Sequence, residues 1–113
     1  MNTADTFKNL ALSFNGVEQL LHFNRTAFKI TGRKIFASLL EEEVTANLLL
    51  SPADQKIYTA YDEAMVYPVS GSYGQQGWTT FKLNKVPVEL LSDALLAAYN
   101  HVLQTTPVKG KRK

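Results

Sequence analysis

The sequence predicts a protein of the α+β class, in which an antiparallel sheet is flanked by helices. Three observations lead to this prediction. Apolar residues recur at helical spacing near the start of the chain, short alternating segments separated by turn residues fill its middle, and a long apolar stripe of helical period lies near its end. A chain of 113 residues, 45% of them hydrophobic, can build one core without disulfides or metal. We expect a single domain over residues 1–108.

The first helix is predicted over residues 3–14, where four apolar residues share one helical face: Phe7, Leu10, Ala11 and Phe14. Thr3 can cap the start of this helix, and Gly16 is expected to end it.

The period then changes to two, which is typical of an antiparallel meander. Turn residues divide this part of the chain into four candidate strands: Gln19–Phe23, Thr26–Thr31, Lys34–Leu40 and Val44–Leu50. In the second of them, Phe28 and Ile30 are expected to face the core, and Lys29 to face solvent or a ligand.

Ser51 and Pro52 form a capped helix start, and a short helix is predicted to about Tyr61. Residues 65–69 are expected to be extended, residues 70–77 to form a loop with three glycines, and residues 78–83 to form a strand. The last helix should begin near Pro87 and cover the sheet with an apolar stripe: Val88, Leu91, Leu95, Ala98 and Val102.

The formal net charge of +2 is unevenly distributed. Four of the 12 basic residues lie in the last five positions, whereas residues 1–108 carry eight basic and ten acidic residues, a net charge of −2. Overall charge therefore does not by itself favour binding to nucleic acid. The basic tail, residues 109–113, is expected to be disordered.

Several function classes are disfavoured by composition. The absence of cysteine excludes disulfides, thiolate metal sites and cysteine nucleophiles. No apolar run approaches the roughly 18 residues of a membrane span, and the N-terminus lacks a signal pattern, so we expect a cytoplasmic protein without membrane contact. His22 and His101 have no third ligand nearby, and Glu41–Glu43 is expected to be a solvated turn. No catalytic motif is present, so we predict a protein that is not an enzyme and has no cofactor.

Two segments could carry a binding function. The glycines of residues 71–77 could cradle a phosphate, but the segment leads into a strand and lacks Lys and Arg, which favours a hairpin loop with positive φ. The aromatic residues Tyr73 and Trp78 could stack on a base or seal the core.

The second segment is basic. Four cations lie within ten consecutive positions: Arg25, Lys29, Arg33 and Lys34. Such a basic β-ribbon could enter a DNA groove, or its cations could protect an edge strand.

Together these elements resemble the MmcQ/YjbR family over roughly residues 5–104. The residues that carry the resemblance are Gly16–Glu18, His22-Phe23, Ala27–Ile30, Gly32–Ala37, Ser51-Pro52, Tyr73-Gly74 and Gly77–Thr79. The resemblance implies an α-β(5)-α fold similar to those of secretion chaperones, and a small cytoplasmic bacterial protein that binds DNA through two β-wings.

The double-wing resemblance also selects the candidate nucleic-acid-binding residues. They are Arg25, Lys29, Arg33 and Lys34 on the first wing, and Gln75, Gln76 and Trp78 on the second. The chain departs from the family pattern at Gln76 and Leu49, where similar chains often have a basic residue. The expected partner is duplex DNA, bound without catalysis. The alternative is a chaperone-like protein-interaction module, with a protein partner or a second copy of the chain.

Overall fold

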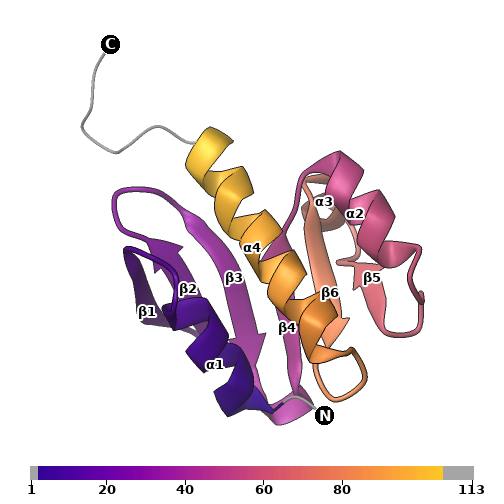
Figure 1. Ribbon diagram of the computed structural model, residues 1–113, viewed down its shortest axis with the longest axis horizontal. Helices are drawn as coiled ribbons and strands as arrows, with labels where there is room; N and C mark the ends of the chain where they lie inside the picture. Colours follow the sequence, from indigo (N-terminus) through magenta and orange to yellow (C-terminus); the bar gives the residue numbers. More distant parts are fainter. Residues whose placement is uncertain (1–2, 106–113) are drawn as a thin grey trace.

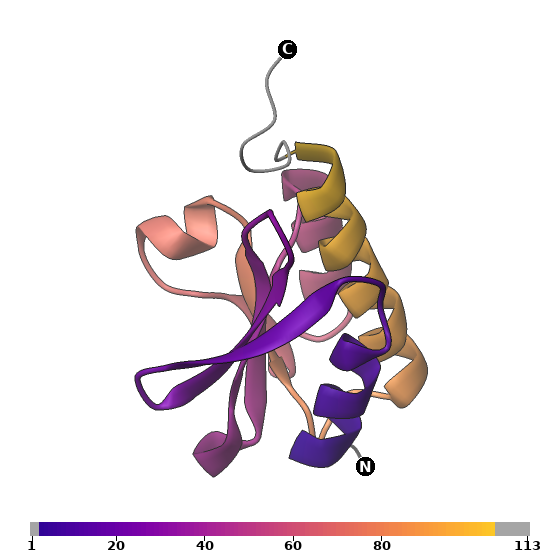
Figure 2. The same ribbon diagram turned by 90° about the vertical axis from the view of Figure 1, so that its left-hand side faces the viewer.

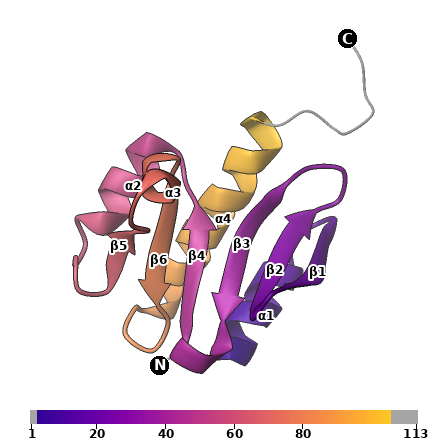
Figure 3. The ribbon, with the colours of Figure 1, turned by 180° about the vertical axis from the view of Figure 1, so that it is seen from behind.

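The structure, a computed structural model, describes residues 3–105, so the basic tail lies outside the described residues. Its sheet contains β1 (Val17–His22), β2 (Arg25–Ile30), β3 (Ile35–Leu40), β4 (Thr45–Leu49), β5 (Val66–Pro68) and β6 (Trp78–Lys82). The strand order is β1-β2-β3-β4-β6-β5, and all neighbouring strands are antiparallel (Figure 3). The predicted meander and the α+β class are therefore confirmed.

The helices lie on both sides of the sheet, but unequally. Three helices cover one face: α1 (Ala4–Leu12), α2 (Pro52–Thr59) and α4 (Val88–Thr105) (Figure 1). The fourth, α3 (Ser72–Gln75), lies on the opposite side together with the projecting end of the β1–β2 hairpin (Figure 2). Between α3 and this hairpin, the second face of the sheet is left without a helix layer. We call it the uncovered face.

The core lies between the sheet and the three covering helices. The largest fully buried side chains include Phe7, Phe28, Phe36, Phe81, Leu48 and Leu95. The ring of Phe7 on α1 meets that of Phe28 on β2 edge to face, with 5.7 Å between ring centroids. Phe28 and Ile30 are buried, as predicted. Because side chains alternate along a strand, burial of these residues directs Arg25, Ala27 and Lys29 to the uncovered face.

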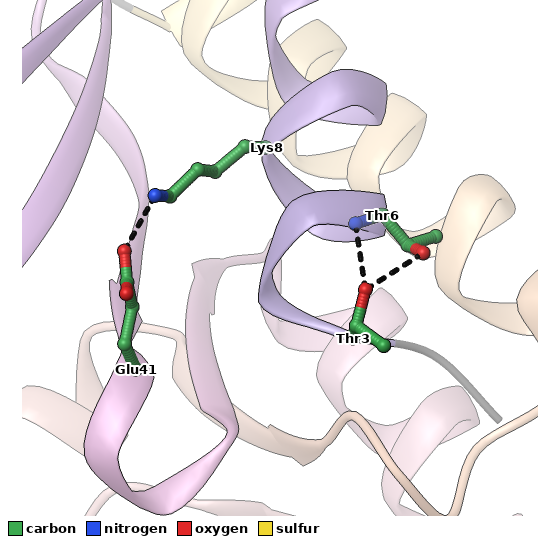
Figure 4. A network of polar contacts seen from close by, with 4 residues as sticks. All are labelled: Thr3, Thr6, Lys8 and Glu41. Carbon is green, nitrogen blue, oxygen red and sulfur yellow. Dashed lines mark hydrogen bonds and ion pairs between the residues drawn. The ribbon is translucent and has the colours of Figure 1, made fainter.

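The predicted helix starts are also confirmed. The side chain of Thr3 accepts a hydrogen bond from the backbone N–H of Thr6 at 3.2 Å (Figure 4), and Ser51 does the same for Asp54 at 3.1 Å. Figure 4 also shows Lys8 on α1 paired with Glu41, at the start of the 3₁₀ turn between β3 and β4. The hydrogen bond to Glu41 raises the pKa of Lys8.

Two predicted boundaries were wrong. The first helix ends at Leu12, not at Gly16. Both the N–H and the hydroxyl of Ser13 donate to the carbonyl of Leu10, at 3.2 and 2.6 Å, and this i to i−3 turn closes the helix. Gly16, with φ of +78°, instead leads into β1, and its carbonyl accepts from the N–H of Thr31 at 2.8 Å. Residues 70–77 are not loop throughout, since the single helical turn α3 lies within them.

Candidate functional site

The uncovered face carries a row of mostly polar side chains across four strands. The register places Ala27 opposite Ser38, Ser38 opposite Asn47, and Asn47 opposite Thr80, so these residues share one face. The hydroxyl of Thr80 lies 2.7 Å from Oδ1 of Asn47 and donates to it. This row forms the floor of the candidate site.

A pocket of about 250 Å³ opens on this face. Its lining includes His22, Arg25, Ser38, Asn47, Tyr73 and Trp78. The lining contains one arginine and no carboxylate, so its charge favours an anionic ligand. An adjoining hollow of about 350 Å³ shares Arg25 and Asn47 and reaches Glu43 and Tyr67. A larger hollow of about 650 Å³ lies between α2 and β5, but Asp62 and Glu63 line it beside a single cation, Lys56.

Arg25, the first residue of β2, is the cation that lines this pocket. Its Nε donates to the hydroxyl of Ser38 at 3.0 Å, which fixes the plane of the guanidinium. Its Nη2 is buried and has no hydrogen-bond partner within residues 3–105. Burial lowers the pKa of Arg25, and the nearby charge of Glu43 acts in the opposite direction. A buried donor without a partner costs free energy. Arg25 as a whole is half-buried and lines the pocket.

The four cations of the predicted first wing do not form one surface. Arg25 and Lys29 lie on the uncovered face, where Lys29 is opposite Glu18 of β1. Arg33 instead donates from Nη1 to the carbonyl of Leu103 at 2.9 Å, near the end of α4. Such a contact stabilises the C-terminus of a helix.

Lys34 is exposed in the same turn as Arg33. Burial lowers the pKa of His101 on α4, and the charge of Lys34 lowers it further. The alternative that these cations protect an edge strand was wrong for β2, because β2 is an interior strand and the edge strand β1 contains no Lys or Arg.

The predicted second wing is the segment around α3. Gln75 and Gln76 are exposed there, and Trp78 is half-buried at the start of β6. Tyr73, which is 62% exposed, lines the same pocket as Trp78. The structure thus brings Trp78 together with Arg25 and Tyr73 in one pocket, whereas Gln75 at the end of α3 and Gln76, its C-cap, do not line that pocket.

Two glycines of this segment have packing roles. A Cβ on Gly74 would lie 1.8 Å from the carbonyl oxygen of Val69, and one on Gly77 would lie 2.0 Å from that of Leu50. Gly77 also has φ of +114°. Gly71 and Gly77 have positive φ, which explains why glycine stands at these two positions, as expected for a loop. Glycine is needed at position 74 because the carbonyl of Val69 leaves no room for a Cβ.

Sequence patterns do not single out Gln55, which holds this segment in place. Its Nε2 donates to the carbonyl of Gly74 at 2.9 Å and to the hydroxyl of Thr79 at 3.0 Å, and it lies 3.3 Å from the carbonyl of Trp78. These partners are 19–24 positions away along the chain, so no local motif could reveal them. Gln55 fixes the position of Trp78 at the pocket.

The two histidines lie on separate elements, His22 on β1 and His101 on α4. Within residues 3–105, no group of three or more His, Asp or Glu side chains could hold a metal ion. No helix in the same range is long and apolar enough to cross a membrane.

Comparison with known families assigns the fold. The YjbR family model matches residues 12–101, which is most of the chain. The chain belongs to the YjbR family. A crystal structure of a Deinococcus radiodurans protein with the family domain DUF419 is similar, with a TM-score of 0.82 and 18% identity over 93% of this chain and 81% of that one. At this identity the likeness establishes the fold alone. A search of curated proteins finds no match to this YjbR chain.

Proposed function

We propose that this YjbR protein is a non-catalytic nucleic-acid-binding domain, and that the uncovered face of its sheet is the binding surface. The observation that carries the proposal is the position of Arg25, the one Arg or Lys that lines a pocket shared with Tyr73 and Trp78. A guanidinium can bind a phosphate, and the aromatic side chains offer flat faces to a base. Lys29 adds a second cation to the same face.

Single-stranded nucleic acid fits this surface better than the duplex implied by the family resemblance. A duplex reader would need a projecting basic wing, but the end of the β1–β2 hairpin exposes two large apolar side chains, Leu21 at 85% and Phe23 at 94%. Bases in a duplex are also stacked on each other and cannot stack on Tyr73 or Trp78. Unpaired bases can, and antiparallel sheets with exposed aromatic residues bind single strands in this way.

The proposed function and the family resemblance together favour a location of the protein in the bacterial cytoplasm, because nucleic acid is found there. A role in protein interaction is the second candidate, because Leu20, Leu21 and Phe23 are exposed on one edge of the sheet.

Fluorescence anisotropy of a labelled 12-nucleotide strand, alone and as a duplex, would test the proposal at salt concentrations of about 50 and 200 mM. We expect tighter binding to the single strand and a steep loss of affinity with salt. Arg25→Ala should weaken binding about tenfold and reduce the slope of log K against log salt by about one. The matched control is Lys56→Ala, since Lys56 is exposed on α2 on the covered side.

A variant without residues 109–113 separates the fold from the tail, whose four cations could bind phosphates by themselves. Binding that survives Arg25→Ala but is lost with the tail would contradict the assignment to the uncovered face. Absence of binding to both forms of the oligonucleotide at low salt would contradict the function itself.

A further inference from the structure

The two edges of the sheet differ in how they are protected from pairing with another strand. The edge strand β5 has only three residues and ends in Pro68, and short strands and proline are common protections. The edge strand β1 has six residues without Pro, Lys or Arg, and five of the six are exposed. An edge of this kind can accept another strand.

The backbone of β1 has free groups at alternate positions. The N–H of Thr31 donates to the carbonyl of Gly16, so residues 16 and 31 form a hydrogen-bonded pair. Because such pairs alternate in an antiparallel ladder, Glu18, Leu20 and His22 direct their N–H and C=O groups toward β2. Val17, Gln19 and Leu21 therefore direct theirs outward, where residues 3–105 add no further strand to the sheet.

We propose that β1 pairs with β1 of a second copy of this chain, antiparallel across a two-fold axis, in the register that places Leu20 opposite Leu20. In this register Gln19 and Leu21 of the two copies form hydrogen-bonded pairs, as the outward direction of their backbone groups requires. Glu18 of each copy lies opposite His22 of the other. The two-fold axis therefore gives two equivalent contacts in which a carboxylate can accept a hydrogen bond from an imidazole N–H. This inference does not depend on nucleic-acid binding.

The exposed apolar side chains of β1 favour a second copy as the occupant. Leu20, 37% exposed, would pack on itself at the axis. Phe23 of one copy would lie opposite Val17 of the other.

Phe23 is unusual within its own chain. It has φ of +60° and is 94% exposed, and its one ring contact within residues 3–105 is with His22, at 5.0 Å. The positive φ belongs to the two-residue turn that joins His22 to Arg25. The turn thereby exposes the ring of Phe23, which an apolar contact from a second copy would cover. One strand thus supplies both halves of a self-complementary interface.

Light scattering coupled to size-exclusion chromatography tests the dimer by its mass, over protein concentrations up to about 1 mM. A single strand pair is a small interface, so we expect a dimer that dissociates on dilution, with a Kd in the micromolar range or weaker. Leu20→Lys places two ammonium groups together at the axis and should raise the Kd at least about tenfold. The matched control Ile57→Lys changes another exposed apolar residue, 64% exposed on α2, and should leave the Kd unchanged.

Gln19→Pro is the second variant, because it tests the direction of the backbone groups. The N–H of Gln19 points outward, so proline there should preserve the β1–β2 pairing and the melting temperature while abolishing the dimer. Glu18→Lys should weaken the dimer, and adding His22→Glu should restore it. A wild-type chain that stays monomeric up to about 1 mM, or a dimer that is unaffected by Leu20→Lys and Gln19→Pro, would overturn the proposal.

Discussion

The covered and uncovered faces of the sheet take alternate residues from the same strands, yet they have different roles. On β2, Phe28 enters the core beneath α1, whereas Arg25 and Lys29 face the opposite side. On β4, Leu48 is fully buried, whereas Asn47 is only half-buried and accepts from Thr80. We infer from this difference that stability depends mainly on the covered face and binding on the uncovered face. A substitution at one residue of a strand should then change stability, and a substitution at its neighbour should change binding.

The largest expected effect is on the covered face. Phe28→Ala should lower the free energy of unfolding by about 3–5 kcal/mol, because it leaves a cavity between α1 and β2. Urea unfolding followed by circular dichroism would measure it. The neighbouring change Lys29→Ala should alter stability by less than about 0.5 kcal/mol and weaken oligonucleotide binding instead. Similar losses of stability from the two variants would break the distinction between the faces.

A smaller effect is expected where the segment of α3 approaches the sheet. Gly77→Ala should cost more than about 2 kcal/mol, because the added Cβ would meet the carbonyl of Leu50 in an unfavourable conformation. Gly16→Ala is the control, since Gly16 also has positive φ but has open space around it, and we expect a loss of about 1 kcal/mol. Equal losses in thermal or urea unfolding would show that the close approach is unimportant.

Gln55→Ala should cost about 1–2 kcal/mol, because the carbonyl of Gly74 and the hydroxyl of Thr79 lose a shared donor. This residue links the two faces, since it lies on a covering helix and positions Trp78. We therefore expect the variant to bind the oligonucleotide more weakly as well. Unchanged affinity alongside reduced stability would mean that Trp78 does not need this support to bind.

The smallest expected effect is a pH dependence on the covered side. Burial, and then the charge of Lys34, lower the pKa of His101 in the fold, so the unfolded chain binds this proton more readily. The stabilisation is complete above the unfolded pKa of about 6.5 and is lost as the pH falls below it. Unfolding of the wild type and of His101→Gln between pH 7.5 and 5.5 should show the wild type losing more stability. Parallel pH profiles would contradict this assignment.

Much of the fold could be predicted from local patterns. The alternation around Phe28 and the cap at Ser51 each depend on neighbours within a few residues, and both are confirmed. The single turn α3 was missed because its four residues include a glycine and are too few to show a helical period.

The candidate site could be predicted only in part. Arg25 and Trp78 were selected from the sequence and do share a pocket. The contact of Arg33 with Leu103 spans 70 positions, and the contacts of Gln55 also join distant segments, so residue type and spacing could not reveal either.

The most direct test uses Trp78, the one tryptophan of the chain, as a probe of the uncovered face. Its fluorescence should change saturably when an unlabelled single-stranded oligonucleotide is added, since bases would stack beside it. The change should require a higher oligonucleotide concentration in Arg25→Ala and at higher salt. An oligonucleotide that binds by anisotropy without altering Trp78 fluorescence, or that binds Arg25→Ala as tightly as the wild type, would contradict the assignment of nucleic-acid binding to this face.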